Sequence, residues 1–127
     1  MKNRVLLDTN ALLVPGTIGI DIFEELEKLL GSYEAVVPDF VISELKSIAK
    51  SGEGRSKVAA KFALELLKKV RVLKTEQKGR VDEAIANIAK ENNFIVFTND
   101  KELRQSLKAK GVKVIYLRQM KYLELVS

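Results

Sequence analysis

The residues best suited to chemistry in this sequence are carboxylates, because the chain contains no histidine and no cysteine. Two of them follow apolar runs that indicate buried strands. Asp8 comes directly after residues 5–7. Asp100 lies two residues after Thr98, which directly follows the run 94–97. The carboxyl ends of parallel strands meet at one edge of a sheet, so both side chains are expected at the same rim. Oxygen ligands of this kind favour a hard divalent cation, Mg²⁺ or Mn²⁺.

Two further carboxylates lie on predicted helices whose apolar spacing turns them inward. Glu44 comes three residues after Val41 and four before Ile48, and it is therefore expected to share the apolar face of its helix. Asp82 precedes Ile85 by three residues at the start of another predicted helix. A carboxylate on a core-facing stripe is costly unless it is paired or binds a cation. Together, the four acids predict a cation site suited to phosphate chemistry, since such an ion neutralises charge on a phosphoryl group.

Each carboxylate also has a purely structural interpretation, which the sequence leaves open. Asp8 could be a turn residue, and Asp82 and Asp100 could cap or begin helices, where acids interact favourably with the helix dipole. Glu44 could pair with a lysine at the edge of the core. Glu83 could replace its neighbour Asp82, although helical phase turns Glu83 about 100° away. The cation site is therefore favoured by the set of four, not by any member alone.

Apolar runs and periodic segments predict strands alternating with helices. The predicted strands lie at residues 5–7, 35–37, 70–73, 94–97 and 112–117, and the predicted helices lie at about 22–30, 40–50, 55–69, 79–92 and 101–110. Pro15 and Gly16 indicate a loop, and Asp39 is expected to cap a helix. Alternation of this kind predicts an α/β fold with three layers, α/β/α, around a central parallel sheet of about five strands. The apolar residues of the tail, 120–126, are expected to pack on the domain or on a partner.

Length and composition indicate one domain over residues 1–127, with an apolar fraction of 46% that is sufficient for a core. The lack of His and Cys excludes Ser-His-Asp triads, thiol nucleophiles, disulfides and Cys- or His-ligated zinc. No apolar run is long enough to cross a bilayer, so we expect a soluble, cytoplasmic protein without a membrane partner. The net charge of +5 favours a polyanionic partner.

Several blocks of the sequence together resemble the PIN-domain ribonuclease family, and the match extends over essentially the whole chain. The blocks are Leu-Asp-Thr-Asn-Ala-Leu at residues 7–12, Ser-Glu-Leu at 43–45, Val-Asp-Glu-Ala-Ile at 81–85, Phe-Thr-Asn-Asp-Lys-Glu-Leu at 97–103 and Gly-Val-Lys-Val-Ile-Tyr-Leu at 111–117. The resemblance implies an endoribonuclease that hydrolyses RNA phosphodiester bonds with Mg²⁺ or Mn²⁺ and leaves a 5′-phosphate and a 3′-hydroxyl. It implies that the catalytic and metal-binding acids are Asp8, Glu44, Asp82 and Asp100. It also implies supporting roles for Asn10 and Thr98.

The family includes VapC-type toxins and nucleases that trim small-subunit ribosomal RNA, and residues 99–103 and 116–117 look closer to the archaeal rRNA-processing branch. The expected partners are RNA (ribosomal RNA in that branch), an rRNA-processing protein or an antitoxin, and a second copy of the chain, since PIN domains often pair. Three alternatives stay open. The chain could be a VapC-type toxin held by its antitoxin, a PIN-fold module that binds RNA or a complex without cutting, or, with least support, a receiver-type α/β domain.

Basic side chains near the carboxylates would have to hold the RNA, because four clustered acids repel phosphates. Lys101, Arg104 and Lys108 share one face of the helix that follows Asp100, and Arg55 and Lys57 follow a glycine-rich segment expected to be flexible. Each of these five could equally be a solvated surface group. Aromatic residues make up only 6% of the chain, so base stacking is expected to contribute little to recognition.

Overall fold

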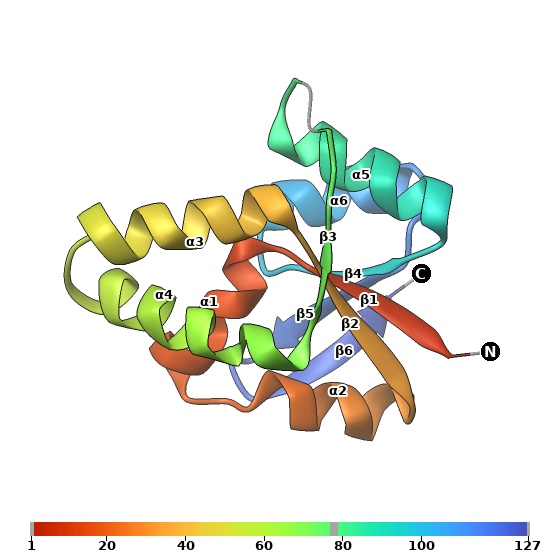
Figure 1. The fold of residues 1–127 in the computed structure, drawn as a ribbon. Coiled ribbons are helices and arrows are strands. Elements are labelled where there is room, and N and C mark those ends of the chain that lie inside the picture. The colour runs from red at the N-terminus through yellow and green to blue at the C-terminus, as the bar shows by residue number, and fades with distance from the viewer. Residues whose placement is uncertain (1, 77–78, 127) are drawn as a thin grey trace.

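In the computed structural model, which describes residues 2–76 and 79–126, strands and helices alternate along most of the chain (Figure 1). The strands are β1 (Asn3–Leu7), β2 (Tyr33–Pro38), β3 (Arg71–Leu73), β4 (Ile95–Phe97), β5 (Val114–Arg118) and β6 (Tyr122–Val126). The α-helices are α1 (Thr9–Ile18), α2 (Ile22–Leu30), α3 (Asp39–Ser51), α4 (Gly54–Leu66), α5 (Val81–Asn92) and α6 (Lys101–Ala109), and the 3-10 turn η1 (Leu67–Lys69) follows α4. No helix in these ranges is long and apolar enough to span a membrane.

The described strands form one sheet in the order β3-β2-β1-β4-β5-β6. All neighbouring pairs from β3 to β5 are parallel, and β6 pairs antiparallel to β5. The prediction of a parallel sheet is confirmed, with one more strand than expected because the apolar tail forms β6 and buries Leu123. The chain reverses through Gln119 and Met120, both at φ 55°, a conformation that glycine and asparagine usually supply.

Two layers of helices bury the central strands of the sheet on both faces, which confirms the three-layer α/β/α architecture, while the edge strand β3 is largely exposed. Val5 and Leu7 of β1 point into the core beneath α1, α2, α3 and α4, whereas Leu6 between them points to the core beneath α5 and α6. Because successive side chains of a strand alternate between faces, a strand buried on both sides consists of apolar residues throughout. The two helical layers lie on opposite sides of the sheet in Figure 1.

The segment expected to be a loop around Pro15 is the helix α1, so that prediction was wrong. Pro15 lies inside α1, and Gly19 ends the helix with φ 83°. Gly16 serves packing instead of a turn, because a Cβ atom built on it would lie 2.5 Å from the Cα atom of Ala59 in α4. The glycine therefore permits a backbone approach between α1 and α4 that a larger residue would prevent.

The buried residues of helix α4 are small: Ala59, Ala60 and Ala63. The apolar spacing of the sequence predicts Val58 and Phe62 on the inward face, but they are 65% and 47% exposed. The alanines allow α4 to lie close to both α1 and α3, so the larger side chains turn outward. The apolar spacing of the helix at 79–92 predicts Val81 on its core face, and this prediction was likewise wrong, since Val81 is 37% exposed.

Two further sequence expectations are corrected around α3. Asp39 does not cap this helix; Pro38 precedes the first turn, and the Asp39 carboxylate instead accepts hydrogen bonds from the amide (3.1 Å) and hydroxyl (2.7 Å) of Thr75. The contact ties the start of α3 to the segment after β3. The glycine-rich connection expected to be flexible is short, because α3 extends to Ser51 and α4 begins at Gly54.

Candidate active site

Asp8 is the buried acid of the site. It leaves the end of β1 and caps α1, and its Oδ1 accepts a hydrogen bond from the amide of Ala11 at 2.8 Å. Its own amide donates to the carbonyl of Phe97 at 3.4 Å, which holds the end of β1 against the end of β4. Only 5% of Asp8 is exposed. The sequence-based interpretation of Asp8 as a turn residue did not include a helix cap, which Asp8 is, but an ordinary helix cap does not need to be buried.

Thr98 and Asp100 follow β4 and lie at the same edge of the sheet as Asp8. Thr98 is fully buried, its amide donates to the carbonyl of Ile115 at 3.0 Å, and its hydroxyl oxygen accepts from the amide of Asp100 at 3.0 Å. Asp100 caps α6 by accepting from the amide of Leu103 at 3.1 Å and is half-buried. The sequence-based placement of Asp8 and Asp100 at one rim is consistent with this arrangement.

Asn99, between these two residues, has a positioning role that sequence analysis did not assign. Its side-chain oxygen accepts a hydrogen bond from the amide of Leu117 in β5 at 2.9 Å. This bond fixes the peptide that connects Thr98 to Asp100 against the neighbouring strand. The available signal was an asparagine directly after a buried strand, where its short polar side chain can bond to nearby backbone.

The environment of Asp8 disfavours its negative charge. The pKa of Asp8 is raised from the ordinary 3.8 to about 7, chiefly by burial and also by the carboxylates of Asp100 and Glu44, against the lowering effect of hydrogen bonds from Thr98 and the Ala11 amide. Asp100 and Glu44 therefore both act electrostatically on Asp8. A cation beside Asp8 would remove this penalty, so the donor set fits a hard divalent ion in its chemistry.

Glu44 does not lie on the core-facing stripe of α3, contrary to expectation. Val41 and Leu45 are buried, but Glu44 is exposed, because it precedes Leu45 by one residue and is rotated about 100° from it. Its charge still reaches Asp8 and raises the pKa there. Figure 1 shows α1 and α3 beginning beside each other where β1 and β2 end, which accounts for this proximity.

Asp82 lies half-buried in the first turn of α5. The carboxylates that chiefly disfavour the charge of Asp8 are Asp100 and Glu44. Across residues 2–76 and 79–126, no three acidic side chains lie close enough together, as they stand, to hold a metal ion. The part of Asp82 in a cation site therefore stays a prediction.

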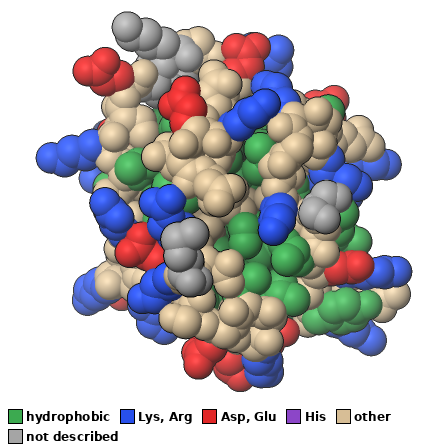
Figure 2. Space-filling model, turned by 90° about the vertical axis from the view of Figure 1, so that its right-hand side faces the viewer, with side chains coloured by type: hydrophobic (Ala, Val, Ile, Leu, Met, Phe, Trp, Pro, Cys, Tyr) green, Lys and Arg blue, Asp and Glu red, His purple; other side chains and the backbone are tan. Residues whose placement is uncertain are grey.

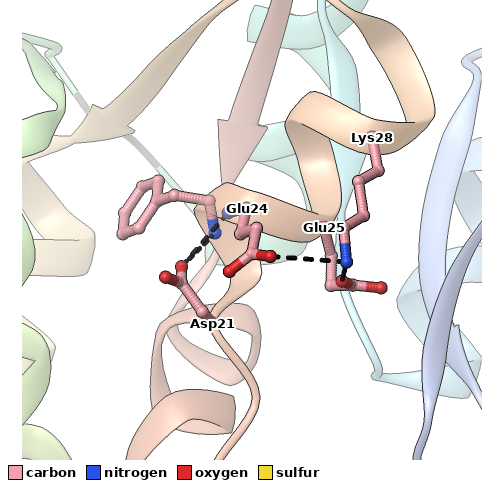
Figure 3. Close-up of polar contacts among 5 residues, drawn as sticks. Asp21, Glu24, Glu25 and Lys28 are labelled. Atoms are coloured by element: carbon pink, nitrogen blue, oxygen red, sulfur yellow. Dashed lines mark hydrogen bonds and ion pairs between the residues drawn. The ribbon is translucent and has the colours of Figure 1, made fainter.

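Acids elsewhere in the protein show how an ordinary acidic group differs from Asp8. Asp21 caps α2 by accepting from the amides of Phe23 and Glu24 at 3.1 Å each, and Lys28 pairs with Glu24 (3.4 Å) and Glu25 (3.3 Å), as Figure 3 shows. The charges of this group are exposed and compensated by a lysine or by helix amides. Asp8 has no lysine or arginine ion-pair partner among the described residues.

The remaining residues expected at the site lie on the helices α1, α4 and α6. Asn10 is exposed on the first turn of α1, without a side-chain hydrogen bond among the described residues. Arg55 and Lys57 lie on the first turn of α4 and not in a flexible loop. On α6, Lys101 and Lys108 are exposed, whereas Arg104 is half-buried with its guanidinium 4.3 Å from the ring centre of Tyr116. Arg104 is thus held by a cation–π contact.

Known proteins resemble this chain in both sequence and fold. It is 36% identical over 126 residues to "Ribonuclease VapC4" of Methanocaldococcus jannaschii, covering 96% of this chain and 95% of the relative. It is 34% identical over 116 residues to "Ribonuclease VapC9" of Archaeoglobus fulgidus, covering 91% of this chain and 84% of the relative. The structure of the PIN domain endonuclease Utp24 superposes with a TM-score of 0.79 at 23% identity, covering 96% of this chain and 90% of Utp24, a likeness of fold. With residues 5–120 matching the family described as a PIN-like domain, the chain belongs to the PIN-like domain family.

Proposed function

We propose that this protein is an endoribonuclease that hydrolyses RNA phosphodiester bonds with a bound Mg²⁺ or Mn²⁺. The observation that carries the proposal is the burial of Asp8 among Thr98, Asp100 and Glu44, with a pKa raised to about 7. A carboxylate kept in such a place without a cationic side chain is costly to the fold, and perturbed acids of this kind concentrate at functional sites. The two relatives named ribonucleases support the same activity.

In this proposal the acids near the strand ends have different roles in binding the cation. Asp8 and Asp100 hold the cation from the ends of β1 and β4, and Glu44 contributes its charge from the exposed flank of α3. When bound, the cation would lower the pKa of a water molecule bound to it and would neutralise charge that develops on the phosphoryl oxygens. Thr98 positions Asp8 through its hydroxyl, and Asn99 positions both Thr98 and Asp100 by its bond to β5. Asp82, in the first turn of α5, is the fourth acid proposed for this set.

The basic residues of α6 would bind the RNA phosphates next to these acids. Lys101 directly follows Asp100, and Arg104 lies one turn later, fixed over Tyr116. Their positive charges offset the repulsion between the RNA phosphates and the acidic rim. Arg55 and Lys57 on α4 are the second set of proposed contacts, on a rigid helix.

The proposal is tested by incubating RNA with the purified protein in Mn²⁺, in Mg²⁺ and in EDTA, and mapping the ends of the fragments. We expect cleavage with 5′-phosphate ends in the metal ions and none in EDTA. Asp8→Asn and Asp100→Asn should lose cleavage, and the matched control is Asp21→Asn, which makes the same chemical change at a helix cap outside the site. RNA retained by the protein without any fragments would support the alternative of a binding module that does not cut.

A toxin role is the second candidate, favoured by the name VapC of both relatives. In that case the chain acts on cellular RNA and is held inactive by an antitoxin. Expression in a host cell should then arrest growth, and Asp8→Asn should relieve the arrest. Mapping cleavage sites across total RNA decides between this role and rRNA processing, which predicts cuts confined to ribosomal precursors. Pairing with a second copy of the chain stays a prediction for light scattering.

A further inference from the structure

A second charged site lies at the end of the sheet opposite to the carboxylates. A hollow of about 340 Å³ opens where β1 and β4 begin and where α5 and α6 end. Its lining contains five basic side chains and no acidic one. The basic residues are Lys2, Arg4, Lys90, Lys110 and Lys113. We call these five residues and the hollow between them the basic pocket.

The cations of the basic pocket are not neutralised by the protein. Within residues 2–76 and 79–126, none of the five forms an ion pair with a carboxylate, whereas Lys28, Arg71 and Arg118 elsewhere do. Arg4 is nevertheless held in place, because its Nη2 donates to the carbonyl of Asn92 at 2.6 Å and its guanidinium stacks 4.8 Å from the ring centre of Phe94. A concave surface with unpaired like charges repels itself and attracts an anion.

Helix dipoles explain only part of this arrangement. Lys90 lies in the last turn of α5 and Lys110 caps the end of α6, where positive charge is favourable. Lys2 and Lys113 lie directly before strands and not in the last turn of a helix, whereas Arg4, in β1, bonds to Asn92 at the end of α5. Figure 2 looks onto the side from which the N-terminus projects in Figure 1 and shows Lys and Arg side chains spread across it.

We infer that the basic pocket is a second phosphate-binding site, which holds the backbone of an RNA strand away from the carboxylates. The ligand class rests on the proposed function, because RNA is the polyanion that a ribonuclease must hold. Lysine ammonium groups bind phosphates as point charges without reading bases. The aromatic ring in this region, Phe94, is 5% exposed and covered by Arg4, so the pocket offers no platform for base stacking. Binding there is therefore independent of sequence.

The pocket and the carboxylates are too far apart for a short RNA to reach both. The five residues of β1 separate them, and at about 3.3 Å per residue this strand spans roughly 17 Å. Along one strand of a duplex the rise is about 3.4 Å per nucleotide, so a dinucleotide is shorter than this separation. A dinucleotide should therefore use the carboxylate end alone, whereas a strand of about 25 nucleotides is long enough to pass around the domain and use both.

The first test measures RNA binding in EDTA, where no cleavage can occur. The probe is a labelled single-stranded RNA of 25 nucleotides, and the variant is Lys110→Gln combined with Lys113→Gln. Each lost phosphate contact removes about 0.7 from the slope of log K against log salt concentration, so we expect the slope to fall by about 1.4 and the affinity at 0.1 M salt to fall on the order of 25-fold. The charge-matched control is Lys50→Gln with Lys61→Gln, two exposed lysines on α3 and α4.

Several outcomes would overturn the inference. An unchanged affinity and slope in the pocket variant, or an equal loss in the control variant, would mean that the basic pocket has no specific part in binding RNA. Polyglutamate is a second probe; if the pocket variant loses polyglutamate and keeps RNA, the pocket receives an acidic protein instead.

The second test uses cleavage and separates this inference from the proposed function. With Mn²⁺, the pocket variant should lose kcat/KM for the 25-nucleotide RNA and keep it for a dinucleotide. A protein that binds RNA through the pocket but never cuts would contradict only the nuclease proposal. A nuclease whose pocket variant cuts both substrates like the wild type would contradict only the pocket.

Discussion

Replacing Asp8 by asparagine should stabilise the metal-free protein at neutral and alkaline pH while removing its activity. The substitution keeps a side-chain oxygen that can accept the hydrogen bond from the Ala11 amide, and asparagine caps helices about as well as aspartate does. It removes the charge that burial, Asp100 and Glu44 disfavour. An acid retained for function at the expense of stability behaves in this way.

The magnitude follows from the pKa of Asp8, which is about 7 in the folded protein and 3.8 in an exposed aspartate. Between these two pH values the folded protein keeps a proton that the unfolded chain has released, so the free energy of unfolding decreases as pH rises and levels off above pH 7. At 1.36 kcal/mol per pKa unit, the loss contributed by Asp8 is on the order of 4 kcal/mol. The buried amide of asparagine adds a desolvation cost of about 1–3 kcal/mol that does not depend on pH.

Urea unfolding followed by circular dichroism at pH 4 and pH 8, in EDTA, measures the effect. The free energy of unfolding of Asp8→Asn minus that of the wild type should increase from pH 4 to pH 8 by most of that amount. The other titrating groups are the same in both proteins and cancel in this difference. Asp21→Asn, the exposed cap of α2, should show no such gain. Mn²⁺ at pH 8 should stabilise the wild type and not Asp8→Asn. If Asp8→Asn is destabilising by the same amount at both pH values, Asp8 is not a charge-disfavoured residue, and the reasoning fails.

Three further predictions concern the supports of the site and the fold. Gly16→Ala places a Cβ atom 2.5 Å from the backbone of α4 and should destabilise the protein by about 1–3 kcal/mol in urea unfolding, whereas an unchanged midpoint would contradict the close packing. Asn99→Ala leaves the amide of Leu117 without its partner; we expect a loss of about 1–3 kcal/mol and a lower kcat, and wild-type kinetics would exclude a positioning role. Thr75 lowers the pKa of Asp39, so this carboxylate contributes stability that is present above pH 3.8 and lost as pH falls through the lowered folded value; Asp39→Asn should flatten acid unfolding in that range.

The sequence was informative where one physical constraint decides the outcome. A strand buried on both faces must be apolar throughout, so the run at residues 94–97 could be recognised as the strand β4 and the run at 5–7 as β1. Parallel strands place their carboxyl ends on one edge, so Asp8 and Asp100 could be assigned to a common rim without knowledge of the packing. Both are also helix caps, an interpretation that sequence analysis had left open for Asp100 and had not considered for Asp8.

The parts that could not be predicted depend on contacts between distant segments. Gly16 is a packing residue because Ala59 lies against it, and nothing near Gly16 in the sequence shows this. The outward turn of Phe62 follows from alanines that fit α4 between two helices. Glu44 was placed inward because it lies at helical spacing from Val41, yet a position on the flank of an apolar stripe can equally face solvent at the rim.

The parallel topology by itself favours acids at one end of the sheet and bases at the other. Only charged residues beyond this expectation indicate function at either end. Helix N-termini gather where parallel strands end, and acids are favourable there; helix C-termini gather where the strands begin, and lysines are favourable there. Acids at one end and bases at the other are therefore expected for structural reasons. Two features go beyond that expectation. Burial raises the pKa of Asp8 to about 7, although an exposed cap such as Asp21 would serve the helix, and Lys2 and Lys113 are cations that lie before strands and not in the last turn of a helix. The charges of these residues destabilise the fold and are not needed by its helices. Binding of a cation at one end of the sheet and of a polyanion at the other therefore explains their presence better than a stabilising role does.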